Sequence, residues 1–598
     1  MDKKAIIGFF LIFLVVILMY TPFYQRLIMG DRQPKSTEAV NDSLSVDSTI
    51  IGSQIVESKV KGDTLLPEEP TPQDVRKESI GSTIESPDIA TVQIENKYIS
   101  ATISTENGGA ITNWELKNYK NSAGGNLNLI NDNGLNIAFT NNDGRQFNLN
   151  EHNLFMKEIG GQRLVLDENN PILVIEFYLP VRNGKVTKKL FFYYDKYSID
   201  VIVKLEGLQD YIINRRYFFS WEKGLESTEK NASEDYSYAR AYASMAGELE
   251  DLDIGANKVE EKPLNGRVDW TSIRTKYFLV SLIPNTPDKM NGAILNASGE
   301  KDNDLLRKIY SVSLDVPLNP TYSQADSFMV YLGPLDYNIL KSYRRDLQTL
   351  IMNKDWYERI FRPIGLLVLY VLKFFHQFIP NYGIVIIIFS VLIKLVLHPL
   401  TKKSYQSMSE MQYFQPKIAE LREKYKNDPQ RMQKEMMKFY KEHGINPLGG
   451  CLPTLLQMPL LVALFVVFRS TIQLRGQPFA LWITDLSQPD ELFLGFSLPL
   501  LGDTIHVLPI LMGITMIWQS KMNITDPKQK MLSYIMPFFL TFIFYSFPSG
   551  LNLYYSLFNL FSMVQTRMIK KKMHPGADVT SEQDKTGSSK KISSKRKK

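Results

Sequence analysis

The feature that most constrains this chain is a set of long apolar runs in its second half, several of them nearly free of charge. About 20 consecutive apolar residues are enough to cross the hydrocarbon core of a bilayer as a helix. The hydrophobic fraction of the whole chain is an ordinary 44%, because it averages these runs with a polar first half. The runs predict spanning helices at 382–400, 448–472, 505–520, 532–547 and 551–569.

A further apolar run, residues 5–20, follows Lys3 and Lys4. A cleaved signal peptide would have this charge pattern, but no small-x-small cleavage site follows Tyr20. We therefore favour an N-terminal transmembrane anchor at 1–21 whose first residue lies in the cytoplasm. Residues 22–90 are rich in Ser, Thr, Glu, Asp and Pro with few aromatics, which predicts a disordered linker.

Residues 91–335 have a different pattern, with short runs that alternate between apolar and polar side chains. Pairs such as Asn183-Gly184 and Asp143-Gly144 separate the runs and are typical hairpin turns. The pattern predicts a single all-β sandwich domain.

The residues needed for metal or acid–base catalysis are scarce. Cys451 is the only cysteine, and the six histidines include no i, i+4 pair, so neither a disulfide nor a metal site is expected. Glu260 and Glu261 are adjacent in a polar stretch that we expect to be a solvated loop, whereas a glycosidase pair must face across a cleft. We expect no enzyme activity, no catalytic residue and no cofactor.

The segment 336–380 connects the β domain to the first of the five spans. Residues 336–357 have helical apolar spacing with a basic opposite face, which predicts an amphipathic helix. Lys373 and His376 interrupt the apolar run 359–379, which favours an interfacial helix over a span. With the anchor the count is then six spans, and both termini and the basic segment 401–447 fall in the cytoplasm, as the positive-inside rule requires.

Lys394 lies deep within the span 382–400. Burial of its ammonium group in lipid would cost on the order of 2.5–3.5 kcal/mol on insertion scales. Either the side chain reaches the cytoplasmic headgroups, near Lys402, or it faces a water-filled cavity in the bundle. The span alone does not decide between the two.

The last span carries polar residues at helical spacing on one face. Such a stripe faces protein or water, since lipid satisfies none of its hydrogen bonds. Ordinary hydrogen bonding between packed helices is the alternative. Together with Lys394 the stripe favours a hydrated groove, to which Gln457 in the span 448–472 would add. The stripe residues are Asn552, Tyr555, Ser556, Asn559 and Ser562.

Residues 401–443 predict a cytoplasmic helical hairpin. Asn427 and Asp428, followed by Pro429, are expected to give the N-cap and the first helical residue of its second helix, and Gly444 its stop. Its methionines either contact varied partners or simply pack within the hairpin. The basic tail 571–598 is too polar to fold and would bind anionic lipid or the phosphates of ribosomal RNA.

Residues 355–570 contain a series of specific motifs, namely NYGIVIIIFSVLIK, HPLTKKSYQSM, INPLGGCLPTLLQMPL, PFALWITDLS, LPILMGITM and FPSGLNLYY. With these motifs the chain resembles the YidC family of membrane protein insertases, in the Gram-negative form with a large periplasmic domain. The resemblance implies a conserved core of five transmembrane helices at 381–570 and a β-supersandwich periplasmic domain similar to sugar mutarotases.

The resemblance also implies a function and a site. Membrane proteins of this family receive polar parts of nascent membrane proteins in a positively charged hydrophilic groove, alone or with the Sec translocon and its accessory subunits. Lys394 stands where well-studied members have arginine, which keeps the charge but loses the planar fork. Ser390, Met458, Tyr554 and Tyr555 match positions associated with the groove or with substrate. The tail and cytoplasmic loops imply ribosome contact, with membrane lipid as a further partner and no DNA.

Three other functions use some of the same features. A transporter or channel also places lysine and polar stripes inside the membrane, but the halves of this chain show no paired, glycine-interrupted repeat. An envelope enzyme is disfavoured by the scarcity of histidines and facing carboxylates. A scaffold that only organises other membrane proteins stays open.

Overall fold

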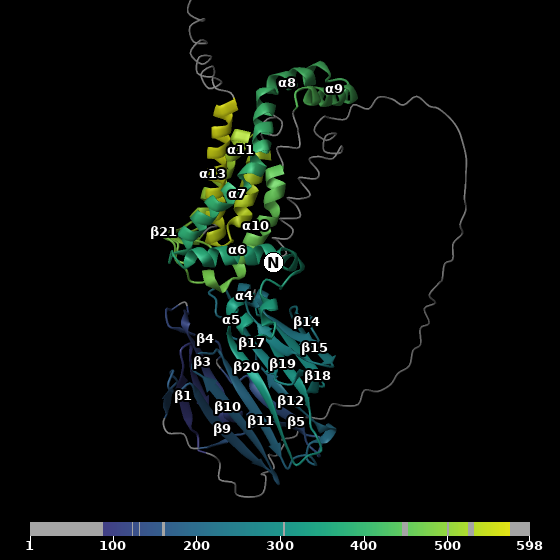
Figure 1. Ribbon diagram of the computed structural model, residues 1–598, viewed down its shortest axis with the longest axis vertical. Coiled ribbons are helices and arrows are strands. Elements are labelled where there is room, and N and C mark those ends of the chain that lie inside the picture. The colour runs from purple at the N-terminus through teal and green to yellow at the C-terminus, as the bar shows by residue number, and fades with distance from the viewer. Residues whose placement is uncertain are drawn as a thin grey trace, which may run out of the picture. The chain divides into compact units, whose positions relative to one another are not determined.

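The computed structural model describes residues 88–573 except 122, 131, 158–161, 303–304, 445–451, 499–501 and 524–531. The predicted anchor 1–21, nearly all of the predicted linker, the INPLGGC motif and most of the basic tail lie outside these residues. Figure 1 shows a region of strands followed by a region of helices.

The β domain is built on two large antiparallel sheets. One sheet has nine strands in the order β14-β13-β16-β17-β20-β11-β10-β9-β7, and the other has six in the order β15-β18-β19-β12-β5-β6. The nine strands are β7 (Phe155–Met156), β9 (Ile172–Val181), β10 (Gly184–Tyr193), β11 (Ser198–Glu206), β13 (Arg240–Met245), β14 (Glu248–Leu252), β16 (Trp270–Arg274), β17 (Phe278–Pro284) and β20 (Ser323–Pro334). The six are β5 (Leu135–Thr140), β6 (Gln146–Asn148), β12 (Arg216–Trp221), β15 (Lys258–Asn265), β18 (Gly292–Asp302) and β19 (Leu305–Pro317).

A smaller five-stranded sheet completes the domain in the order β4-β3-β2-β1-β8. Its strands are β1 (Thr91–Glu95), β2 (Ile99–Ser104), β3 (Ile111–Lys120), β4 (Asn126–Asn128) and β8 (Arg163–Val165). Short helical turns join the strands, namely α3 (Glu106–Gly109), η1 (Leu149–Glu151), η2 (Ile213–Arg215), α4 (Ala232–Tyr238) and η3 (Pro287–Lys289). The described part of the chain therefore confirms the mostly β character predicted for this region.

Aromatic side chains fill the space between the sheets. Phe219 of the six-stranded sheet stacks on Phe328 of the nine-stranded sheet with ring centroids 4.2 Å apart. Trp114 of β3 donates its indole N–H to the Leu332 carbonyl of β20 at 2.9 Å. Because the buried ring nitrogen is satisfied, the tryptophan contributes its large apolar area to the core without a polar penalty.

The connector departs from the predicted helix over 336–357. The structure has a short helix α5 (Tyr337–Ser342) and a 3-10 turn η4 (Leu347–Leu350). Arg344 and Asp346 adopt left-handed backbone conformations, with φ of 54° and 57°, and break the helix between them. The single-helix expectation was wrong here because tertiary contacts override the local apolar spacing.

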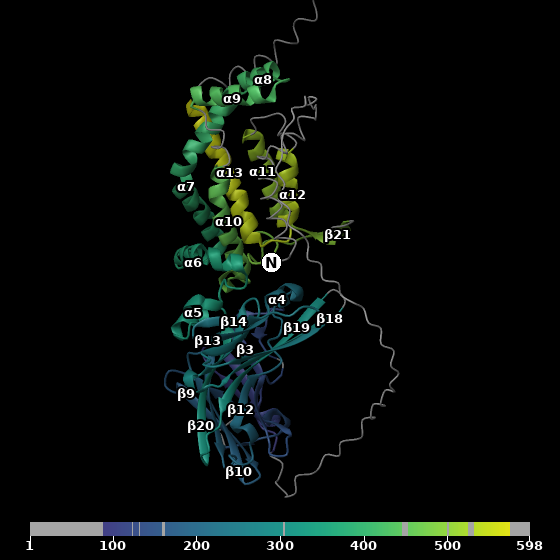
Figure 2. The ribbon, with the colours of Figure 1, turned by 90° about the vertical axis from the view of Figure 1, so that its right-hand side faces the viewer.

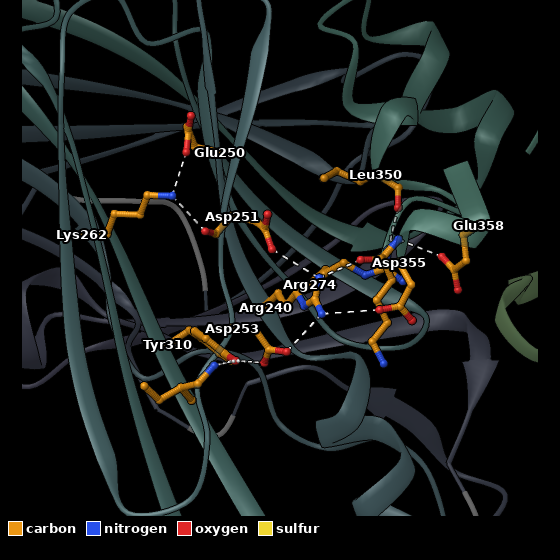
Figure 3. Close-up of polar contacts among 12 residues, drawn as sticks. Arg240, Glu250, Asp251, Asp253, Lys262, Arg274, Tyr310, Leu350, Asp355 and Glu358 are labelled. Carbon is orange, nitrogen blue, oxygen red and sulfur yellow. Dashed lines mark hydrogen bonds and ion pairs between the residues drawn. The ribbon is translucent and has the colours of Figure 1, made fainter. Parts of the chain in front are cut away.

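A cluster of charged side chains holds the connector on the β domain (Figure 3). Arg240 of β13 contacts Asp251, Asp253 and Asp355, and Asp355 immediately precedes helix α6. Arg274 of β16 donates to the Leu350 carbonyl at 2.6 Å. These bonds explain why the chain turns at η4 instead of continuing as a helix.

The helical region begins with α6 (Trp356–His376) and α7 (Tyr382–Tyr413). Helix α7 continues through Pro399 and ends well beyond the predicted span 382–400. Two shorter helices, α8 (Gln415–Lys424) and α9 (Pro429–Glu442), follow it. The Asp428 carboxylate accepts from the Arg431 N–H at 3.0 Å, which confirms a cap at this helix start and assigns it to Asp428 instead of Asn427.

The remaining helices are α10 (Leu452–Ser470), α11 (Val507–Asn523), α12 (Leu532–Phe544) and α13 (Ser549–Met573). Between α10 and α11 lie the 3-10 turn η6 (Ile472–Leu474) and a hairpin of β21 (Leu492–Leu498) and β22 (Gly502–Ile505). Within the described residues, Tyr382–Tyr413 is the one helix both long and apolar enough to cross a membrane. Shorter apolar helices cover Gln457–Ser470, Val507–Met522 and Tyr534–Phe544. The six-span arrangement therefore stays a prediction.

Candidate functional site

The polar stripe of the last predicted span lies on α13, where this helix packs against α7 and α11. Asn552, Ser556, Asn559 and Ser562 are all buried. The hydroxyls of Ser556 and Ser562 each donate to the carbonyl four residues earlier, at 2.8 Å. The stripe thus faces neighbouring helices, as polar residues in an apolar helix must.

Lys394 of α7 meets this stripe directly. Its ammonium group donates to the Ser562 hydroxyl at 2.7 Å. The same nitrogen lies 4.4 Å from the centroid of the Phe558 ring and 5.5 Å from that of Tyr405. Among the described residues no carboxylate lies within ion-pair distance of it. The site therefore holds a cation through one hydroxyl and two aromatic faces.

Two further polar pairs extend the contact between α13 and its neighbours. The Asn559 amide donates to the Thr515 hydroxyl of α11 at 3.4 Å. Gln565, one turn beyond Ser562, contacts the His398 ring at 2.8 Å and the Thr401 hydroxyl at 3.4 Å, both on α7.

Other polar atoms near this contact are buried without a hydrogen-bond partner among the described residues. These atoms are the hydroxyls of Tyr554 and Tyr555, Oδ1 of Asn552 and Oε1 of Gln565. Tyr554 is fully buried, with its ring centroid 6.1 Å from that of Phe389 on α7. An unpaired buried hydroxyl costs about 1–3 kcal/mol, so such groups have a partner wherever one is available.

The structure does not join every predicted site residue to this cluster. Ser390 lies fully buried one turn before Lys394, but its hydroxyl donates within its own helix, to the Ile386 carbonyl at 2.7 Å. Gln457 and Met458 lie half-buried on α10. In the described part of the chain no hydrogen bond links them to Lys394.

Sequence reasoning missed Thr515, His398 and Gln565. Gln565 continues the spacing of the α13 stripe by one more turn, so the periodicity alone was sufficient to find it. Thr515 and His398 are single polar residues on other helices, and only the helix packing reveals that they face the stripe.

Outside the Lys394 site, the described residues hold no cluster that suggests catalysis. Glu260 and Glu261 lie exposed on the edge strand β15. The prediction of a loop was therefore wrong, whereas the prediction that both side chains are solvated is confirmed. Successive strand residues point to opposite faces of the sheet, so the two carboxylates do not share a site. Among the described residues, no group of three or more His, Cys, Asp or Glu side chains is arranged to hold a metal.

The described residues combine a large all-β domain with a helical region in which Tyr382–Tyr413 is long and apolar enough to cross a membrane. Two family models match the chain, the YidC periplasmic domain over residues 91–363 and the 60Kd inner membrane protein over residues 374–576.

Curated relatives extend over almost the whole chain. The membrane protein insertase YidC of Chlorobaculum parvum is 33% identical and covers 95% of this chain and 94% of its own length. That of Chlorobium luteolum is 41% identical over 62% of this chain and 63% of its own length. A solved structure of an active YidC insertase with its first transmembrane domain resolved is 16% identical, covers 81% of this chain and 95% of its own, and has a TM-score of 0.34.

The chain belongs to the YidC family of membrane protein insertases. It acts on nascent membrane proteins in the bacterial inner membrane, and residues 91–363 match the periplasmic domain of that family.

Proposed function

We propose that α7, α11 and α13 form a hydrated, positively charged groove that receives polar segments of a nascent membrane protein. The observation that carries this proposal is the Lys394 ammonium group, bonded to Ser562 and facing no carboxylate in the described part of the chain. An ammonium group has three N–H donors, and one serine uses only one of them. Water or an acidic substrate segment would satisfy the others.

The unpaired hydroxyls support the same proposal. Tyr554, Tyr555 and Lys394 come from two helices in contact, so one ordered set of waters could serve all of them. The groove would lower the cost of bringing a charged, short extracytoplasmic segment part of the way into the membrane. Burial of the substrate's own apolar span in lipid would then drive its release.

The proposed topology has six spans with both termini in the cytoplasm. Helix α6 would lie flat in the interface at the periplasmic surface, because its exposed apolar residues follow one helical face. These residues are Trp356, Ile360, Leu367, Tyr370 and Phe374. The opposite face packs on α10, so the helix is amphipathic in the way interfacial helices are.

Partners follow from surface chemistry. The basic tail 571–598 and the cationic surfaces of α8 and α9 would bind ribosomal RNA through phosphate neutralisation, which weakens with salt. Cooperation with the Sec translocon and its accessory subunits is part of the same proposal.

Site-specific photocrosslinking to a ribosome-bound, stalled membrane protein tests the groove. We expect crosslinks to the nascent span from probes at Lys394 and Tyr555. The matched control is Leu395, the next residue of α7, which is exposed on the outside of the bundle and should crosslink weakly at the same chain length. Equal crosslinking from positions 394 and 395, or none from 394 and 555 in the folded protein, would contradict the groove.

A further inference from the structure

The β21–β22 hairpin presents two large aromatic side chains to the outside. Phe493 and Phe496 are 67% and 61% exposed. The strand pairing shifts between Phe493 and Leu498, and Gly495 adopts a φ of 76°, so the regular alternation of side chains is broken there. Neither ring is needed to fill the hairpin itself.

The stem of the hairpin is nevertheless tightly fixed. The Asp490 carboxylate, which is buried, accepts from the N–H groups of Val507 and Leu508 at 2.8 and 3.0 Å. Asp490 precedes the hairpin and α11 follows it, so the carboxylate caps the first turn of α11 across the hairpin stem. These two bonds hold the ends of the hairpin together, and the same carboxylate also accepts from the Trp482 indole at 2.9 Å.

The preceding loop is pinned to the start of α13. The Ser549 N–H donates to the Gln488 carbonyl at 2.7 Å, and the Gly550 N–H donates to the Leu486 carbonyl at 3.0 Å. The hairpin is thus not a loose loop whose aromatic rings are exposed by chance. A rigid base sets the direction in which Phe493 and Phe496 project.

The position of the hairpin indicates what surrounds these rings. β22 ends at Ile505, and α11 begins at Val507. Helix α11 is apolar over Val507–Met522, so the hairpin stem lies where a membrane segment begins. Figure 2 shows β21 projecting from the helices near the level of α6. Between Leu492 and Ile505 the only charged residue is Asp503, which suits a bilayer interface better than bulk water.

We propose that the β21–β22 hairpin is an interfacial anchor that places Phe493 and Phe496 at the boundary between headgroups and acyl chains of the outer leaflet. Phenyl rings bury a large apolar area at this depth, whereas in water they would be an uncovered patch. The anchor fixes the outer end of α11, one wall of the groove. This inference rests on the proposed membrane topology.

Spin-label accessibility in the full-length protein tests the anchor. On a Cys451→Ser background, Phe493→Cys and Phe496→Cys are labelled separately and reconstituted in vesicles of phosphatidylethanolamine and phosphatidylglycerol. We expect a ratio of oxygen to water-soluble nickel accessibility several-fold higher than at Val259→Cys. Val259 is the matched control because it is an exposed apolar residue on the edge strand β15 of the β domain.

A label at Val391, an exposed position of α7, separates this inference from the proposed topology. If Val391→Cys is lipid-accessible while positions 493 and 496 match Val259, the anchor is wrong and the topology stands. If Val391→Cys is also water-accessible, the topology itself fails and the anchor with it. If both reagents fail to reach positions 493 and 496, a protein partner and not lipid covers the two rings, which would overturn the inference.

Discussion

At the scale of single residues, the site depends on how the half-buried cation of Lys394 is solvated. An arginine would present five donors in a rigid plane, whereas the ammonium group of Lys394 is compact and directs its donors more freely. Ser562 takes one donor at 2.7 Å and the rings of Phe558 and Tyr405 cover other directions. The remaining donor capacity is what a substrate carboxylate would use.

Two substitutions of Lys394 separate the effect of its charge from the effect of its side-chain shape. We expect Lys394→Ala to slow insertion of a client with an acidic extracytoplasmic segment about ten-fold, equivalent to about 1.4 kcal/mol. Lys394→Arg should retain most activity because the charge is kept. A reconstituted insertion assay with acidic and neutral versions of one client measures the effect, with Leu395→Ala as the control. Normal insertion of the acidic client by Lys394→Ala would remove the role assigned to the charge.

A fully buried lysine, Lys188, lies in the β domain. The Lys188 ammonium group donates to the carbonyls of Gly108 and Gly109 at 2.8 and 2.9 Å, and burial lowers the pKa of Lys188 to about 7. The unfolded chain keeps its proton up to its ordinary pKa of 10.5. Between these values the unfolded state binds more protons, so the free energy of unfolding should rise with pH, by up to about 1.4 kcal/mol per pH unit.

Denaturant unfolding of the full-length protein in detergent, from pH 7 to 9, measures this slope through tryptophan fluorescence. Lys188→Met should flatten the slope. Lys189→Met is the control, because Lys189 is partly exposed and pairs with Glu176 at 2.9 Å. An unchanged slope in Lys188→Met would show that another group titrates.

At the scale of elements, local signals were predictable and long-range ones were not. The start and end of α9 follow from Asp428, Pro429 and Gly444, since capping chemistry depends on neighbours in sequence. The α13 stripe follows from periodicity in the same way. The break in the connector does not, because the Arg274 side chain that captures the Leu350 carbonyl comes from a strand 76 residues earlier.

The start of α7 offers a test of such a long-range contact. Asn381 caps the helix and donates to the Phe479 carbonyl at 3.1 Å, and an added Cβ at Gly383 would lie 1.9 Å from the Phe479 ring. We expect Gly383→Ala to destabilise the protein by about 1–3 kcal/mol, more than the helix-propensity gain of about 1 kcal/mol.

Thermal unfolding in detergent measures this effect. Gly365→Ala in α6 is the matched control, because its Cβ would meet the flexible Met352 sulfur at 2.9 Å, which can move aside. Equal midpoints for the two variants would show that the Phe479 ring also yields easily.

At the scale of the whole molecule, charged pairs join the β domain to the helices. Arg475, just beyond η6, donates to Glu229 at 2.7 Å, and both side chains are buried. Arg469 at the end of α10 donates to Glu234 of α4 at 3.0 Å, and Lys276 lies 3.1 Å from the same carboxylate. In two of these three pairs the partners lie more than 200 positions apart along the chain, so no local pattern in the sequence predicts them.

Loss of the Glu234 charge should weaken this junction more than loss of any exposed pair. Glu234→Gln leaves Arg469 and Lys276 buried without a carboxylate between them, which typically costs about 3–5 kcal/mol. We expect faster proteolysis and hydrogen exchange in α4 and at the end of α10. Lys230→Gln is the control, because its pair with Glu491 is exposed and contributes at most about 1 kcal/mol.

The junction should also respond to acid in a definite direction. Burial raises the pKa of Glu234, but Lys276 and Arg469 more than offset this and hold the pKa below its ordinary value. A carboxylate with a lowered folded pKa contributes stability above its unfolded pKa and loses it as the pH falls through the folded pKa. After correction for the intrinsic pH dependence of amide exchange, the hydrogen-exchange protection of α4 should therefore fall on acidification below the ordinary glutamate range in the unsubstituted protein and stay nearly constant in Glu234→Gln. Parallel profiles for the two proteins would mean that the β domain is held on the helices by other contacts, with Glu229 and Arg475 the next pair to test.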